Sequence, residues 1–207
     1  MSTSHSNQIN EIIQIAQLLE PMSVLDIGVG NGKYGFLLRE YLGINRDIDK
    51  NNFVIDGIEG YKKYITSIQE KIYNEIFLFQ INGSIDLPQK EYDLCLLIDV
   101  LEHFDKDKGL ELLNSTFSIS KFVLLTTPWN IGDTKIQHDN PLENHKYQWT
   151  KKDFSQFKYH SFIYNPDSLI VLFSSQMDQI KYVQKKMKHR FYNNIYDYLR
   201  FLLRIKK

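Results

Sequence analysis

The hydrophobic pattern of the chain alternates between short continuous apolar runs and longer stretches with helical spacing. Short, mainly apolar segments at 24–27, 53–59, 76–80, 92–99 and 122–126 predict strands, and the nearly continuous apolar run at 92–99 is typical of a parallel strand covered on both faces. Between them, apolar residues recur every three or four positions, which predicts helices over 7–20, 34–42, 61–73 and 106–120. Such alternation indicates an α/β fold, a parallel sheet with right-handed crossovers whose ligand lies beyond the carboxyl ends of the strands.

The pattern changes after Pro128. A polar stretch over 129–148 predicts a long loop, and Thr150 is a suitable N-cap for a short helix that runs through Phe157. Two apolar segments, 161–164 and 169–173, flank a turn-forming Asn-Pro-Asp sequence. These segments predict an antiparallel hairpin that completes the sheet.

Glycines alternate directly after the first predicted strand, at Gly28, Gly30 and Gly32. Glycine allows a positive φ and a close approach of the backbone to a ligand, and the helix that follows presents unpaired N–H groups. This spacing differs from the G-x-G-x-x-G of dinucleotide folds, and the preceding Asp26 would repel a pyrophosphate but suit a cationic ligand. Glu59 ends the second strand, where an acid can accept both hydroxyls of a ribose. The sequence therefore predicts a nucleoside pocket.

Composition supports one soluble domain. The chain has 207 residues, of which 43% are hydrophobic and 24% charged, and its formal net charge is zero, so no overall field favours nucleic acid. The single cysteine, Cys95, excludes a disulfide framework. The first residues are polar, and no run approaches the ~20 apolar residues of a membrane span. We therefore expect a cytoplasmic protein, with a domain over 1–175 and an extension over 176–207.

Three motifs in order resemble those of the class I S-adenosylmethionine-dependent methyltransferases. They are Val24 to Gly32, Glu59 after the second strand, and Asp99-Val100-Leu101-Glu102-His103 after the fourth. This resemblance, over about residues 20–128, implies a Rossmann-like, seven-stranded, mostly parallel sheet with an antiparallel last strand and helices on both faces. It also implies S-adenosylmethionine as cofactor and S-adenosylhomocysteine as product.

The resemblance assigns cofactor contacts to particular residues. The loop with Asp26, Gly28, Gly30 and Gly32 would hold the methionine part, and Glu59 the ribose. Ser84, where many relatives carry aspartate, would lie at the adenine amino group, and Asp99 would support the cofactor. The alternative is that Asp26 only stabilises the turn and Glu59 is a solvated strand end.

Asp99, Glu102 and His103 stand at positions i, i+3 and i+4, so a helical turn there would place them on one face. Two carboxylates and an imidazole at the mouth of a pocket could bind a divalent cation. They could equally support the cofactor and the turn without a metal.

The segment 140–150 favours a hydroxyl acceptor, because it resembles two kinds of methyltransferase. In small-RNA 3′-terminal 2′-O-methyltransferases the corresponding residues bind a metal, and here they would be Asp99, Glu102, His103 and His145, with aspartate where glutamate is usual. In sugar and polysaccharide methyltransferases His145 would instead be a general base or an acceptor contact. We therefore expect His145 and His103 to be catalytic, and a small-molecule or glycan acceptor rather than nucleic acid. A non-catalytic cofactor-binding module is the alternative, and the glycine spacing disfavours a nicotinamide dehydrogenase.

The last segment predicts a basic amphipathic helix. Residues 176–207 contain nine Lys or Arg and two Asp, a net charge of +7, so the rest of this neutral chain carries −7. Apolar residues recur at helical spacing from Ile180 to Leu202. Such a helix could pack on the domain or on a second subunit, lie on an anionic membrane, or bind RNA.

Overall fold

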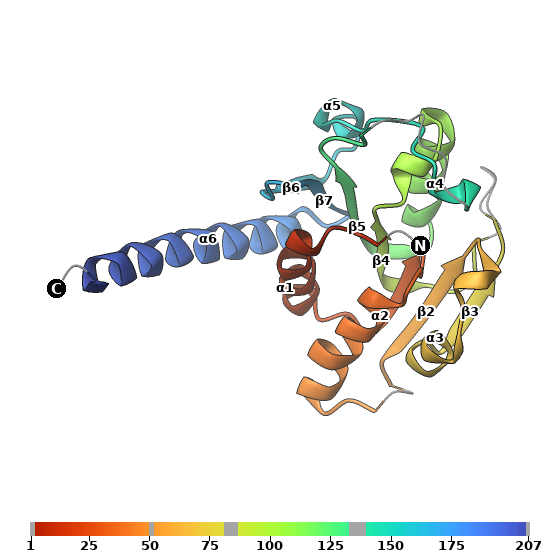
Figure 1. Cartoon of the computed structure of the whole chain (residues 1–207), viewed down its shortest axis with the longest axis horizontal. Helices are drawn as coiled ribbons and strands as arrows, with labels where there is room; N and C mark the ends of the chain where they lie inside the picture. The colour runs from red at the N-terminus through yellow and green to blue at the C-terminus, as the bar shows by residue number, and fades with distance from the viewer. Residues whose placement is uncertain (1–2, 50–51, 81–86, 133–139, 206–207) are drawn as a thin grey trace.

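A seven-stranded sheet with strand order β3-β2-β1-β4-β5-β7-β6 forms the centre of the molecule (Figure 1). The computed structural model describes residues 3–49, 52–80, 87–132 and 140–205. The strands are β1 (Ser23–Ile27), β2 (Val54–Glu59), β3 (Glu75–Leu78), β4 (Tyr92–Ile98), β5 (Ser120–Pro128), β6 (His160–Ile163) and β7 (Ser168–Ser174). The α-helices are α1 (Ile9–Leu19), α2 (Lys33–Leu38), α3 (Ser67–Ile72), α4 (Lys106–Phe117), α5 (Lys151–Phe154) and α6 (Met177–Ile205).

The pairing of the strands confirms the predicted Rossmann-like fold class. Strands β1 to β5 pair in parallel, whereas β7 is antiparallel to both β5 and β6. The two antiparallel pairs come from the hairpin predicted around Asn165. The chain order within the sheet reverses at β1, between β2 and β4, where ligands of open α/β sheets bind.

Alternating side chains of the central strands build two apolar cores. In β4, Leu94, Leu96 and Ile98 pack toward α1, α2 and the start of α6. Cys95 and Leu97 point the other way, toward α4 and α5. Because both faces are covered, the strand is apolar at nearly every position, which explains its continuous hydrophobic run.

The predicted helix over 61–73 was wrong in its middle. The chain forms a 3-10 turn at Lys62–Tyr64 and a separate helix, α3. Thr66 has an extended backbone between them, and its backbone N–H donates to the side-chain oxygen of Gln69 at 3.0 Å. This reciprocal capping box starts a new helix at Ser67 and prevents a continuous one.

Other boundaries also moved. The segment after α2 continues as a π-type turn at Arg39–Gly43 and a 3-10 turn at Ile44–Arg46, where a loop was expected to begin at residue 45. Helix α5 ends at Phe154, before the predicted Phe157.

Helix α6 projects away from the rest of the molecule (Figure 1). Its first turns join the α1 side of the core through Ile180 and Val183, both buried, and through the partly buried Met187. A division of the chain at residue 176 remains a prediction. Within the described residues, no helix combines the length and apolar character that crossing a membrane would need.

Candidate active site

A cavity of about 440 Å³ lies at the carboxyl edge of the sheet. The glycine loop after β1, the end of β2, the turn after β4 and the segment 140–146 all contribute to its wall. Among the predicted site residues, those that line it are Gly28, Gly30, Glu59, Asp99, Glu102, His103 and His145. Ser84 lies outside the described residues.

The glycine loop needs glycine for conformation and for space. Gly28, Gly30 and Gly32 have φ values of 83°, 50° and 76°, which other residues rarely adopt. At Gly28 a Cβ atom would also lie 2.8 Å from Cγ2 of Val100. The loop is tied to the end of β2, because the backbone N–H of Gly28 donates to the carbonyl of Ile58 at 2.9 Å. Gly32 precedes α2 and does not line the cavity.

Glu59 is fixed between the loop and the strand that carries it. Its two carboxylate oxygens accept hydrogen bonds from the backbone N–H groups of Gly30, at 2.8 Å, and Tyr61, at 2.7 Å. Burial raises the pKa of Glu59 above its ordinary value, and these bonds oppose the shift. The carboxylate therefore remains in one position on the cavity wall.

Asp26 lies beneath the loop and is absent from the cavity wall. It is buried, and the hydroxyl of Tyr73 donates to its carboxylate at 2.5 Å. Burial raises the pKa of Asp26 to about 7, although the Tyr73 hydrogen bond opposes this shift. In this structure Asp26 supports the loop from within and does not face a ligand in the cavity.

Tyr73 is a part of the site that the sequence analysis missed. Its ring passes behind two glycines, since a Cβ atom at Gly35 would lie 2.4 Å from Cζ of Tyr73 and one at Gly57 3.1 Å from Cδ1. The ring therefore fixes the spacing between α2, β2 and the glycine loop. The only signal in the sequence was an apolar position at the end of a predicted helix.

Asp99 is held by one side chain from β5 and one from the N-terminal segment. Its carboxylate accepts hydrogen bonds from Thr126 Oγ1 at 2.8 Å and from Gln8 Nε2 at 2.6 Å. The backbone N–H of His5 lies 3.3 Å from the same carboxylate, and residues 3–5 also line the cavity. This N-terminal wall was not predictable from the sequence, because its contacts with Asp99 span more than ninety positions.

Three of the four residues predicted to bind metal come together. One possible ligand atom from each of Glu102, His103 and His145 lies within 4.8 Å of the others, and no other such group occurs among the described residues. The two imidazole rings are 5.1 Å apart between centroids. Asp99 is not in this group, because it lies outside the 3-10 turn Leu101–His103 with a φ of 53° and bonds to Thr126.

Backbone contacts hold the two histidines in position. Nδ1 of His145 lies 2.6 Å from the carbonyl oxygen of Ile131, and Nδ1 of His103 lies 3.4 Å from that of Asn144. Because a carbonyl only accepts, these contacts favour the tautomer with the proton on Nδ1. Nε2 of His145 then carries the lone pair that can accept a proton or bind a metal.

Glu102 is buried and has an unsatisfied oxygen. None of the described residues donates a hydrogen bond to its Oε2 atom. Burial, with a contribution from the Asp99 charge, raises the pKa of Glu102 well above its ordinary value, and the neighbouring Thr127 hydroxyl opposes only part of this shift. A buried carboxyl oxygen of this kind fits either a proton or a cation, because both would compensate it.

The donor set therefore fits a divalent cation, and the cavity fits a nucleoside. One carboxylate and two imidazoles suit Zn²⁺, Fe²⁺ or Mn²⁺ better than Mg²⁺. The loop at Gly28 to Gly30 provides a close backbone approach, and Glu59 provides a fixed acceptor beside it.

Comparisons with known proteins identify the fold. No protein-family model matches the sequence, and no curated protein sequence is similar to it. The structure is similar to the N-terminal domain of EvdMO1, determined in the presence of SAH and D-fucose, with a TM-score of 0.59 and 11% identity over 84% of this chain and 85% of that one. It is also similar to the methyltransferase domain of bacterial CtHen1-C, with a TM-score of 0.54 and 19% identity over 82% and 98%.

A third similar structure is magnesium protoporphyrin IX methyltransferase from Synechocystis PCC 6803 with bound SAH. The TM-score is 0.56, with 16% identity over 82% of each chain. The protein therefore has the Rossmann-like fold of the class I methyltransferases, in agreement with the resemblance of its motifs.

Proposed function

We propose that this protein is an S-adenosylmethionine-dependent methyltransferase that methylates a hydroxyl group of a carbohydrate or a ribose. The observation that carries the proposal is the position of His103 and His145 on the same cavity as the glycine loop and Glu59. Support for the cofactor comes from similar structures determined with SAH, and one of them was also determined in the presence of a sugar.

The loop and Glu59 would hold the nucleoside end of the cofactor. Two glycines with positive φ let the backbone approach the ligand closely, and the Glu59 carboxylate, fixed by Gly30 and Tyr61, would accept the ribose hydroxyls. The bound cofactor supplies a sulfonium methyl carbon, which is already electrophilic. The protein therefore needs no covalent nucleophile and has to orient the acceptor and remove a proton.

His145 is the proton acceptor in this proposal. Nε2 of His145 would remove the hydroxyl proton of the acceptor, whose oxygen would receive the methyl group that the bound cofactor supplies. The contact of Nδ1 with the Ile131 carbonyl at 2.6 Å fixes the ring for this role and stabilises the imidazolium that forms. His103, whose ring centroid is 5.1 Å away, would position the same acceptor.

A metal-dependent reaction on the terminal ribose of a small RNA is the second candidate. The cluster of Glu102, His103 and His145, with the unsatisfied oxygen of Glu102, favours it. A cation held there would lower the pKa of an acceptor hydroxyl and hold it in line. Asp99 is not part of this cluster, and its carboxylate is bonded to Gln8 and Thr126, so it would have to move closer to become a fourth ligand.

The first experiment measures cofactor binding. We expect SAH to bind the protein in titration calorimetry, and Glu59→Gln to weaken the binding by about tenfold or more, because an amide offers one oxygen where Gly30 and Tyr61 need two. Glu70→Gln, an exposed change on α3, is the matched control and should bind SAH normally. Binding of NAD with no binding of SAH would overturn the proposal.

The second experiment follows the transfer of a labelled methyl group to a panel of sugars, ribonucleosides and short RNAs. We expect His145→Gln to lower turnover by about a hundredfold, and His189→Gln, an exposed histidine on α6, to leave it unchanged. Activity that survives exhaustive chelation would exclude the metal-dependent candidate. SAH binding without transfer to any acceptor would instead support a non-catalytic cofactor-binding module.

A further inference from the structure

Helix α6 joins the core through its first turns and then continues well beyond them. The helix has 29 residues, which corresponds to a length of about 43 Å. Its buried or partly buried contacts with the core are Ile180, Val183 and Met187, all in its first three turns. Beyond them the helix extends away from the sheet and from the other helices (Figure 1).

The face of α6 opposite the core contacts carries a regular row of side chains. Lys181, Lys185, Lys188 and Tyr192 follow one another at intervals of four, three and four residues, and all four are exposed. Residues at this spacing share one helix face. The row therefore changes from basic to aromatic as the helix leaves the domain.

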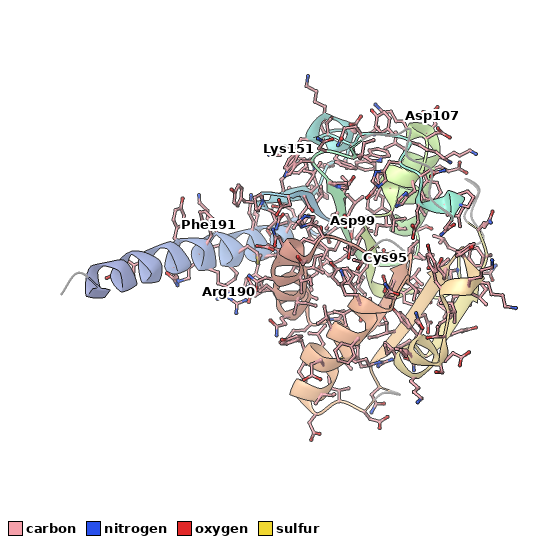
Figure 2. The ribbon with its side chains drawn as sticks, in the orientation of Figure 1. Cys95, Asp99, Asp107, Lys151, Arg190 and Phe191 are labelled. Atoms are coloured by element: carbon pink, nitrogen blue, oxygen red, sulfur yellow. The ribbon has the colours of Figure 1, made fainter. Side chains whose placement is uncertain are left out.

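An exposed aromatic cluster lies where α6 leaves the domain. It consists of Tyr164 from the turn between β6 and β7, with Phe191 and Tyr192 from the helix, which are 71%, 46% and 56% exposed. The ring of Phe191 is 5.6 Å from that of Tyr164 and 5.9 Å from that of Tyr192. Figure 2 places Phe191 and Arg190 together on the projecting part of the helix. Aromatic rings beside basic side chains are favoured at the boundary of a lipid bilayer.

The charge distribution selects among possible partners. Residues 176–207 carry +7 and the remainder of the chain −7. An anionic surface would attract the helix and repel the acidic domain, so that the projecting helix approaches first. Two copies of α6 packed side by side would bring like charges together, which opposes a helix pair.

The sequence of the outer turns also favours lipid over RNA. From residue 195 to 205 it contains Ile, Leu and Phe at six of eleven positions, with Arg200 and Arg204 between them. Phosphates and bases require cations and aromatic rings but no aliphatic residues. A helix that combines aliphatic, aromatic and basic residues is typical of binding in the plane of a membrane surface.

We infer that the outer part of α6, together with the aromatic cluster, docks this protein onto an anionic membrane surface. The basic row would contact acidic headgroups, while Phe191, Tyr192 and Tyr164 insert at the level of the headgroups. The acidic domain, with its cavity, would remain in the aqueous phase.

Vesicle sedimentation with the full chain tests this inference. We expect the protein to bind vesicles of phosphatidylcholine and phosphatidylglycerol at 50 mM salt, to bind pure phosphatidylcholine vesicles at least tenfold more weakly, and to dissociate at 500 mM salt. Two double variants should each reduce vesicle binding at least tenfold. One combines Phe191→Ser with Tyr192→Ser, and the other combines Lys185→Glu with Lys188→Glu. All four side chains are exposed, so the fold should be retained, which circular dichroism would verify.

A matched control reverses the same charges elsewhere. The double variant Lys151→Glu, Lys152→Glu changes two exposed lysines of α5, and Figure 2 places Lys151 away from the projecting helix. It should leave vesicle binding unchanged. The inference is overturned if the intact chain ignores phosphatidylglycerol, or if the α6 variants bind like the intact chain. If the intact chain forms a dimer and does not bind vesicles, and the Phe191→Ser, Tyr192→Ser variant is monomeric, the surface belongs to an interface with a second copy. Salt-sensitive binding of single-stranded RNA without vesicle binding would assign it to RNA.

Discussion

Three buried acids surround the candidate site, and they differ in how their charge is compensated. Asp26 accepts one hydrogen bond from Tyr73, Glu59 accepts two from backbone N–H groups, and Glu102 leaves one oxygen without a donor among the described residues. Burial raises the pKa of all three. Glu59 has the most complete compensation, which fits a residue that remains charged to bind a ligand.

Asp26 makes the stability of the fold dependent on pH. Its pKa rises from 3.8 to about 7 on folding, so the folded state retains a proton that the unfolded state releases. Protonation of Asp26 therefore contributes most to the free energy of unfolding below pH 4. This contribution falls as the pH rises toward 7 and does not change further above pH 7. The replacement Asp26→Asn removes this dependence while it keeps an oxygen for the Tyr73 hydroxyl.

We therefore expect the natural protein to lose stability relative to the Asp26→Asn variant as the pH rises from 4 to 7. The change is of order 4 kcal/mol at most, because each pKa unit corresponds to about 1.4 kcal/mol. Urea unfolding at a series of pH values measures it. A difference that stays flat over this range would contradict the assignment, as would the same slope in the exposed control Glu111→Gln.

At the scale of elements, α4 is placed by one close contact. Gly109 lies in the middle of this helix against the indole of Trp149, and a Cβ atom there would be 2.4 Å from Cζ2 of Trp149. Trp149 itself follows the segment that carries His145 and is buried among Phe154 and Tyr147. The glycine thus allows α4 to approach the segment that forms one wall of the cavity.

Gly109→Ala should destabilise the protein by about 1–3 kcal/mol, although alanine is the better helix former by about 1 kcal/mol, because the methyl group overpacks the indole. Urea unfolding measures the change. Asn114→Ala, at an exposed position of the same helix, is the control and should be neutral or slightly stabilising. If overpacking is the cause, Trp149→Phe should reduce the cost of Gly109→Ala. A stabilised Gly109→Ala variant would contradict this account.

Elements specified by local sequence were predictable, and contacts between distant segments were not. The strands, the glycine turn and the hairpin around Asn165 follow from runs, spacing and turn residues. The break before α3 was also present locally, in the Thr66-x-x-Gln69 capping pattern, and helical periodicity obscured it. The bond from Gln8 to Asp99 joins residues 91 positions apart, and the Tyr73 bond to Asp26 spans 47. Neither has a periodic signal, so only the tertiary structure reveals them.

The candidate site was predictable to the same extent. Its cavity residues were found where a motif follows a strand, as at Gly28, Glu59 and His103. The separation of Asp99 from Glu102 could not be predicted from the sequence, because the i, i+3 argument assumes a helix that includes both residues. The chain instead has a positive φ at Asp99, and the 3-10 turn begins at Leu101. A single backbone conformation therefore decides which carboxylates can share a ligand.

At the scale of the whole molecule, the outer part of α6 projects from the sheet and the helices that cover it (Figure 1). Among the α6 side chains that the structure describes, those buried or partly buried against the core lie at or before Met187. The aromatic contact of Phe191 with Tyr164 joins two exposed rings and buries little apolar surface. The stability of the domain should therefore be independent of the outer part of the helix.

Truncation after Lys188 tests this independence. We expect its free energy of unfolding to stay within about 0.5 kcal/mol of the full chain, and SAH binding to be unchanged, because none of the removed side chains that the structure describes lines the cavity or enters the core. Ile180→Ala, which leaves a void between α6 and α1, should cost about 2–5 kcal/mol in the same urea experiment. A truncated chain that loses as much stability as Ile180→Ala would show that the outer helix packs on the domain or on a second copy. Membrane docking by that helix would then lose its basis, because the surface would already be covered.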